Sequence, residues 1–360
     1  MHIPDGYLSP STCATLYAGS VAGWYAALKR LKRSLLSRLV PLISVFAAFA
    51  FVVMMFNLPL PGGTTGHPVG VTVAAIVLGP SGAILAISIA LAIQALFFGD
   101  GGITTLGANC FNMAIVGSLV AYASYRLIAG GAAIASKRRI AAAAVAGYLA
   151  INASAFVAAI ELGIQPLLFH DAAGTPLYAP YPLSIALPAI MIGHLSFAGL
   201  AEAVISAGLV AYLEVADPKL LRKTSGITVG GEERLGAPQL TSAFPRRLWL
   251  AVALLMLVTP VGILATGKAW SEWSPVEFAA NGSKAQVAAA ATMSKATIPV
   301  GMQRLASLWT APFPAYAPAF VKSAAFGYLL SAMFGVGFVL AVCLLAQHCL
   351  DRRRSAGHSL

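Results

Sequence analysis

The chain has 360 residues, of which 59% are hydrophobic and only 10% are charged, and its mean hydropathy is +0.82. A water-soluble core cannot bury so much apolar surface, so the composition excludes a soluble globular protein and predicts an all-α polytopic membrane protein. The formal net charge is +11, but the Lys and Arg residues lie in short runs between apolar segments. That pattern orients membrane helices and argues against nucleic acid as a partner.

Nine apolar runs predict nine membrane helices, seven in a first module and two near the C-terminus. The runs are residues 13–28, 39–58, 68–79, 81–98, 105–128, 140–163, 183–213, 247–267 and 321–347. If the third and fourth runs make two passes, 18 of the 23 Lys and Arg residues fall on the same side as "KRLKR" at 29–33. By the positive-inside rule, we expect that side to be cytoplasmic, with the N-terminus outside and the C-terminus inside.

A polar segment divides the chain. Residues 214–246 are charged and rich in Gly and Pro, which indicates a cytoplasmic linker. It separates a module over 1–213 from a module over 247–360, whose two helices flank an outer loop at 268–320.

The opening "MHIPDGYLSP" predicts a free amino terminus beside an imidazole. No Lys or Arg precedes Lys29, and Pro4, Asp5 and Gly6 interrupt any early apolar stretch, so we expect no cleavable signal peptide. The amine of Met1, the amide nitrogen of His2 and the Nδ1 atom of His2 can then close two fused rings on one metal ion. A planar site needs a fourth nitrogen, which His67 of "NLPLPGGTTGHPVG" can supply.

Four nitrogens in a plane suit Ni(II), Cu(II) and, less well, Co(II), whereas Mg(II) and Ca(II) take oxygen ligands. The alternative is that two lone histidines in outer loops are only interfacial residues. We expect the two-helix module to make no direct contact with this site.

Other polar residues are candidates for orienting the ligands. They are Asn57, Thr65, Asp100, Asn109 and Asn112. Asn109 and Asn112 could instead cap or cross-link helices. His194 lies inside the seventh helix, where an ionisable residue is either functional, as a possible further metal ligand, or part of a helix–helix hydrogen bond. Both interpretations of His194 stay open.

Two classes of function fit these residues. One is a transport subunit that captures a metal ion, and the other is a membrane-embedded metalloenzyme using His2, His67 and His194, with Asp100 as acid or base. A hydrolytic metal site keeps an open position for water, whereas four planar nitrogens fill the equatorial positions. This favours transport over catalysis.

Three segments, "MHIPDGYLSP", "NLPLPGGTTGHPVG" and "FGDGGITTLGANCFNMA", with the basic stretch after the first helix, resemble the CbiM/NikM family. These proteins are the substrate-binding (S) components of cobalt and nickel energy-coupling-factor (ECF) importers. The resemblance covers about residues 1–213 and implies a seven-helix module that binds metal through Met1, His2 and His67. Residues 247–347 resemble the small two-helix N component, here fused to the first module.

The resemblance also implies partners and a location. The sequence contains no GxxxxGK[ST] phosphate loop, so ATP hydrolysis would need a separate cytoplasmic ATPase (A component) and a transmembrane coupling subunit (T component). The implied location is the inner membrane of a prokaryote. Ni(II) or Co(II) would be the transported ligand, for cobalamin synthesis or nickel metalloenzymes, with no bound cofactor and no enzyme activity.

Overall fold

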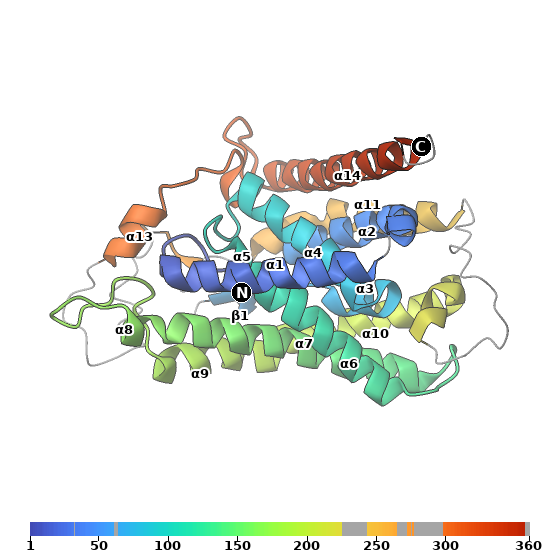
Figure 1. Cartoon of the computed structure of the whole chain (residues 1–360), viewed down its shortest axis with the longest axis horizontal. Coiled ribbons are helices and arrows are strands. Elements are labelled where there is room, and N and C mark those ends of the chain that lie inside the picture. Colours follow the sequence, from blue (N-terminus) through green and yellow to red (C-terminus); the bar gives the residue numbers. More distant parts are fainter. Residues whose placement is uncertain are drawn as a thin grey trace.

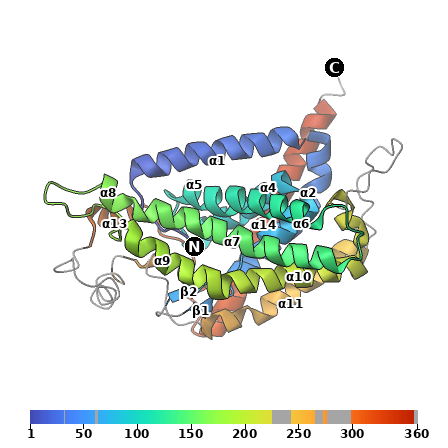
Figure 2. The same ribbon diagram turned by 90° about the horizontal axis from the view of Figure 1, so that it is seen from below.

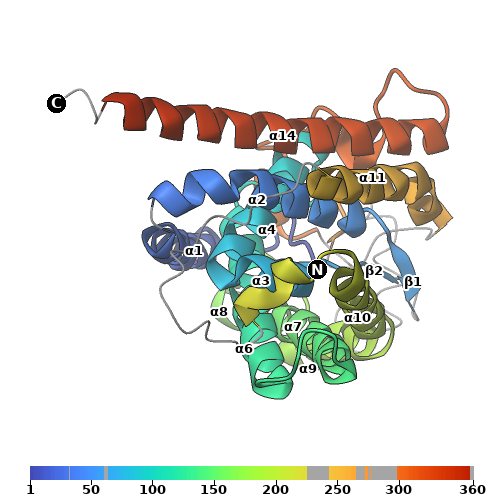
Figure 3. The ribbon, with the colours of Figure 1, turned by 90° about the vertical axis from the view of Figure 1, so that its right-hand side faces the viewer.

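The computed structural model describes residues 1–31, 33–60, 64–224, 243–264, 272–274, 276 and 298–356. Several helices run roughly along the longest axis of the molecule (Figure 1), whereas the long C-terminal helix Ala324–Ala356 crosses that direction (Figures 2 and 3). The α-helices are α1 Pro10–Arg30, α2 Arg33–Met54, α3 Val71–Leu78, α4 Pro80–Ile93, α5 Leu106–Asn109, α6 Gly117–Ala129, α7 Lys137–Gly163, α8 Gln165–Leu168, α9 Leu183–Gly193, α10 Gly199–Ala216, α11 Ala243–Val258, α13 Val300–Leu305 and α14 Ala324–Ala356. Strands β1 (Leu58–Leu60) and β2 (Thr64–Gly66) form a short antiparallel pair.

Several helices are joined end to end by π-helical or 3-10 turns. The π-helical turns are η1 Gln94–Phe98, η2 Cys110–Val116 and η3 His194–Ala198, and the 3-10 turns are η4 Pro218–Thr224, η5 Thr259–Leu264 and η7 Pro314–Tyr316. Because of these junctions, α9, η3 and α10 form one apolar segment of 34 residues. A π-helical turn shifts the face that the following helix presents, and such turns are frequent at functional sites.

The helices make this a multi-pass membrane protein. Five segments of the described chain are long and apolar enough to cross a bilayer: 80–98, 106–129, 137–168, 183–216 and 324–352. Shorter apolar helices cover 39–54 and 248–263. Within the described residues, every predicted apolar run coincides with a helical segment, although α2 ends at Met54 rather than at 58. Pro59 and Pro61 follow closely, and proline cannot donate the hydrogen bonds that would continue a helix.

The third and fourth apolar runs form separate helices. Gly79 lies between α3 and α4 with φ +75°, a conformation that suits glycine and breaks the helix there. The eight residues of α3 rise only about 12 Å, well short of the roughly 30 Å hydrocarbon core. All eight are buried, so α3 lies inside the protein and not against lipid.

The two modules pack as layers. Figure 3 shows α14 outermost, with α2 and α11 beneath it and α6, α7, α9 and α10 on the opposite side. Helix α1 runs along one edge (Figure 2). Both α11 and α14 contact α2, so the C-terminal helices extend the first module's bundle.

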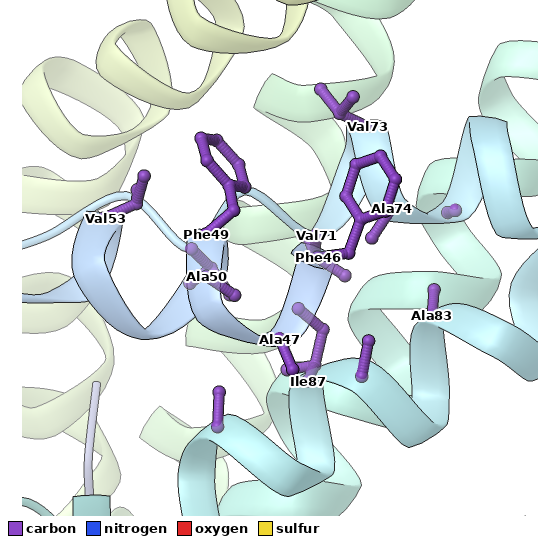
Figure 4. Packing of buried hydrophobic residues seen from close by; sticks show 14 of the residues in the cluster. Phe46, Ala47, Phe49, Ala50, Val53, Val71, Val73, Ala74, Ala83 and Ile87 are labelled. Atoms are coloured by element: carbon purple, nitrogen blue, oxygen red, sulfur yellow. The ribbon is translucent and has the colours of Figure 1, made fainter. Parts of the chain in front are cut away.

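The core between α2, α3 and α4 is built from alanines interleaved with larger apolar side chains (Figure 4). The residues shown there include Phe46, Ala47, Phe49, Ala50, Val53, Val71, Val73, Ala74, Ala83 and Ile87. Small residues let helices approach closely. The resulting van der Waals contacts help to drive helix association when lipid is the solvent.

The predicted linker begins with ordered structure. Helix α10 continues to Ala216, and η4 follows it directly. Leu221 of η4 is fully buried, and its carbonyl accepts a 3.1 Å hydrogen bond from the Arg139 guanidinium. The first part of the predicted linker, up to residue 224, therefore packs against the first module. Residues 225–242 of the predicted linker lie outside the described residues.

A pair of glycines in α14 tests its packing on α2. A Cβ atom at Gly335 would lie 2.0 Å from the buried Phe51 ring, whereas one at Gly337 would meet nothing within 4 Å. We expect Gly335→Ala to lower the free energy of unfolding by about 1–3 kcal/mol through overpacking. Gly337→Ala is the control and should be neutral or stabilising by about 0.5–1 kcal/mol. Thermal unfolding in detergent measures both, and equal midpoints would contradict the packing.

Candidate metal centre

The amino-terminal segment is buried inside the bundle. In Figure 3 the N-terminus lies in the middle of the molecule, between α3 and α10. The His2 side chain is only 2% exposed, and Ile3, Tyr7 and Leu8 are buried. Helix α1 starts directly after this segment, where the Ser9 hydroxyl accepts a 3.1 Å hydrogen bond from the Thr12 N–H. The N-cap therefore fixes where the buried segment ends.

Asn109 of α5 holds the main chain of Ile3. The Ile3 N–H donates to the Asn109 Oδ1 atom at 2.8 Å, and the Asn109 amide donates to the Ile3 carbonyl at 3.1 Å. That carbonyl also accepts from the Gly102 N–H at 3.0 Å and from the Thr105 hydroxyl. The residue next to His2 thus has its polar main-chain groups satisfied inside the protein.

Asp5 makes a second anchor. Its carboxylate accepts from the N–H groups of Ile103 at 3.1 Å and Thr104 at 2.7 Å, and from the Thr104 hydroxyl. A Cβ atom at Gly102 would lie 2.3 Å from the Asp5 nitrogen, so only glycine permits this approach. The opening segment therefore packs directly on the segment around 100–109, and the contact depends on Asp5 and Gly102.

The two predicted ligand histidines meet. The Nε2 atom of His67 lies 3.1 Å from the Nδ1 atom of His2, and the rings stack with centroids 4.8 Å apart. The His67 Nδ1 atom lies 3.1 Å from the Pro68 carbonyl, which can only accept. Nδ1 therefore carries the proton, and Nε2 keeps a lone pair facing His2. Burial, with the neighbouring His2 and the amino-terminal charge, holds the pKa of His67 well below its ordinary value.

Two carboxylates flank these nitrogens. The Asp100 Oδ1 atom lies 3.0 Å from the His2 Nδ1 atom, and the Met1 amine lies 3.1 Å from the Glu272 Oε1 atom. Burial raises the pKa of Asp100, but the charge and hydrogen bond of His2 outweigh it, so the pKa lies below its usual range. The Asp100 and Glu272 side chains are 22% and 18% exposed, against 2% for His2 and 1% for Met1. The carboxylates therefore lie on the more accessible side.

The C-terminal module touches the site, contrary to the expectation from the sequence. Besides Glu272, the Tyr316 hydroxyl donates to the Asp100 Oδ2 atom at 2.6 Å and accepts from the Gln94 amide at 3.0 Å. The Trp273 carbonyl accepts from the Tyr7 hydroxyl at 2.9 Å. These contacts satisfy polar groups that the first module buries, which explains why the outer segment folds over the amino terminus.

The remaining candidates have different surroundings. Asn112 donates to the Glu161 Oε2 atom at 2.7 Å, so its amide links η2 to α7 and does not orient an imidazole. The N–H of Asn57 donates to the Met55 carbonyl, and the side chain of Thr65 lies outside the described part of the chain. The Nδ1 atom of His194 pairs with the Ile190 carbonyl of its own helix at 2.8 Å.

His194 keeps a buried Nε2 atom that has no hydrogen-bond partner among the described residues, and His2 Nε2 is in the same position. No described contact joins His194 to His2 or His67. In the described ranges, no three His, Cys, Asp or Glu side chains are arranged to hold a metal ion. A metal between the two histidines would therefore need further ligands besides these side chains.

Three residues that contact the site or its neighbouring chain were not predicted from the sequence. They are Glu272, Tyr316, and Glu202 of α10, which contacts the segment after His67. Of these three residues, only Glu202 stands out in the sequence, since a carboxylate within an apolar segment is uncommon.

Comparison with known proteins identifies the family. The model of the cobalt uptake substrate-specific transmembrane region, CbiM, matches residues 2–220. A fused nickel transport protein of Rhodobacter capsulatus is 51% identical over 362 residues, covering 99% of this chain and all of the relative. A probable fused nickel transport protein of Lactiplantibacillus plantarum is 38% identical, covering 98% of this chain and 99% of the relative.

A solved structure agrees with these relatives. The crystal structure of a truncated transition metal transporter superposes with a TM-score of 0.55 at 51% identity, covering 59% of this chain and 98% of that one. The chain is thus a metal transport protein of the membrane and not an enzyme, with a companion segment fused as in the nickel relatives. It belongs to the CbiM family of substrate-specific transmembrane proteins.

Proposed function

We propose that this chain captures Ni(II) or Co(II) at the outer face of the inner membrane of a prokaryote and delivers it to an energy-coupling-factor importer. The ligands would be the Met1 amine, the His2 amide nitrogen, the His2 Nδ1 atom and the His67 Nε2 atom. The observation that carries the proposal is the 3.1 Å separation of the two imidazole nitrogens, with the tautomer of His67 already set.

That separation fits one arrangement of the four nitrogens. In the fused chelate, the amine and the His2 Nδ1 atom take opposite corners of a square, and the amide takes the corner between them. His67 must then occupy the corner next to Nδ1. Nitrogens at neighbouring corners, each about 2.0 Å from a metal, lie about 2.8 Å apart, whereas opposite corners are about 4 Å apart. The observed distance matches neighbouring corners.

The two carboxylates would have different roles once the metal binds. A coordinated amine keeps two N–H bonds, so Glu272 can remain hydrogen-bonded to Met1. Asp100 contacts Nδ1 of His2, which is the nitrogen that the metal takes, so Asp100 must give up that contact. The 2.6 Å hydrogen bond from Tyr316 still satisfies its other oxygen. Both negative charges lie beside the site and favour a divalent cation.

We propose the module boundaries at 1–213, 214–246 and 247–360, with the first module as S component and the last as N component. The family match over residues 2–220 supports a first module of about this length, and the fused nickel relatives support a second module joined to it. With no GxxxxGK[ST] motif in the sequence, the energy would come from a cytoplasmic ATPase through a transmembrane coupling subunit. On this proposal the N-terminus faces outward and the C-terminus lies in the cytoplasm, as the distribution of basic residues favours.

Single substitutions test the ligands. We expect His2→Ala and His67→Ala each to weaken nickel binding by more than about 100-fold, because each removes a metal ligand and not merely a supporting group. His170→Ala is the control, since that histidine is exposed and its Nδ1 atom lies 3.0 Å from the Asp171 carbonyl. Calorimetry with NiCl₂ on purified full-length protein measures the affinity, and parental affinity in either ligand variant would refute the assignment.

An extension of the amino terminus tests the amine. One alanine placed before Met1, with its processing checked by mass spectrometry, moves the amine away and breaks the fused chelate. We expect loss of cellular nickel uptake, while a C-terminal extension of the same size leaves uptake unchanged. Parental uptake by a protein proven to carry the amino-terminal extension would exclude Met1 as a ligand.

A further inference from the structure

A buried carboxylate from α10 reaches the chain beside His67. Glu202 has no exposed surface, and its Oε2 atom accepts hydrogen bonds from the N–H of Val69 at 2.7 Å and the N–H of Gly70 at 2.9 Å. Glu202 lies within the apolar segment 183–216, where an ionisable side chain is costly to bury. These two hydrogen bonds tie α10 to the main chain just before α3.

The bonded N–H groups begin α3. Gly70 is the N-cap of that helix, adopts φ +73° and supplies no side-chain hydrogen bond. Ser, Thr, Asp or Asn usually caps a helix from its own chain segment, and negative charge is favourable there. Glu202 provides the capping acceptor from a helix more than 130 residues away. Inside a membrane protein these N–H groups have no water to replace it.

The same two bonds constrain His67. Only Pro68 separates His67 from Val69, and the proline ring fixes its own φ angle. The His67 Nδ1 atom is in turn held by the Pro68 carbonyl at 3.1 Å. The imidazole is therefore tied to a short stretch of main chain whose far end Glu202 fixes. A small shift of that stretch would separate the His67 Nε2 atom from the His2 Nδ1 atom.

We propose that Glu202 is a positioning residue for metal binding, which holds the His67 imidazole where it can complete the nitrogen site. This inference rests on the proposed metal site. Glu202 does not touch the metal and acts only through His67. A purely structural cap of α3 would instead affect stability without any selective link to that imidazole.

The chain offers a matched control in Glu161 of α7. This carboxylate is also buried in an apolar segment, but its Oε2 atom accepts from the Asn112 amide at 2.7 Å, away from the segment 67–70. Glu161→Gln therefore removes a comparable buried carboxylate and leaves the main chain beside His67 untouched.

The first measurement is calorimetric titration of the full-length protein with NiCl₂. We expect Glu202→Gln to weaken binding by about 10- to 100-fold, as for other residues that orient a metal ligand, and Glu161→Gln to stay within about threefold. Glu202→Asp, one methylene shorter, should fall between them and provides the comparison if Glu202→Gln gives no folded protein. Equal affinities for the Glu202 variants and Glu161→Gln would overturn the proposal.

A double-mutant cycle separates positioning from a structural effect. In a His67→Ala background, Glu202→Gln should cause no further loss of affinity, because the imidazole through which it acts is gone. Cu(II) is the probe for the cycle, since it binds nitrogen ligands most tightly and keeps the remaining three-nitrogen chelate measurable. The same loss in both backgrounds would overturn the proposal. If the parent and Glu161→Gln also bind no metal, the proposed function itself fails.

Discussion

The main chain of Ile3 can lie inside a membrane-embedded bundle because its polar groups are paired there. Asn109 pairs with both of them, at 2.8 and 3.1 Å, and Gly102 and Thr105 also donate to the carbonyl. An unpaired N–H or C=O group would be costly where no water can reach it. Since Ile3 is fixed, His2 and the amine of Met1 have little freedom. His67 and Asp100 both contact His2, and Glu272 contacts the Met1 amine, so the buried terminus is what brings these three residues together.

The contact between the modules carries backbone strain. Ala315 and Tyr316 adopt φ angles of 53° and 58°, in the left-handed region that residues other than glycine rarely enter. Tyr316 nevertheless stacks on Phe98 with centroids 5.0 Å apart and directs its hydroxyl to Asp100. Packing of this kind can hold a strained turn in place. The fused C-terminal module thus contributes a precise contact to the centre and not merely two more membrane helices.

The sequence was sufficient for the parts of this protein that are local in the chain. Apolar runs located the helices, because a membrane helix must be long and apolar. The chelate of the opening dipeptide, whose three nitrogens belong to two adjacent residues, stays a prediction. For Asn109, the residue was identified but not its contact, since an amide can serve an imidazole or a main chain equally well. This choice depends on what packs opposite, which no local pattern contains.

Long-range partners were beyond sequence reasoning. Glu202, Glu272 and Tyr316 reach the site from positions more than 130 residues away from their partners. Their spacing in the chain carries no information on that proximity, which arises from how α10 and the C-terminal module pack. An intramembrane glutamate can be flagged as unusual, but its target becomes visible only in three dimensions.

In the proposed site, four nitrogens of the amino terminus and His67 hold the transported metal in a plane. The most direct measurement is metal analysis of protein purified from medium with equal nickel and cobalt, together with the absorption spectrum and magnetism of the bound ion. We expect nickel to be bound at least as tightly as cobalt, in a yellow or orange diamagnetic complex. A paramagnetic, octahedral nickel spectrum would contradict the planar site.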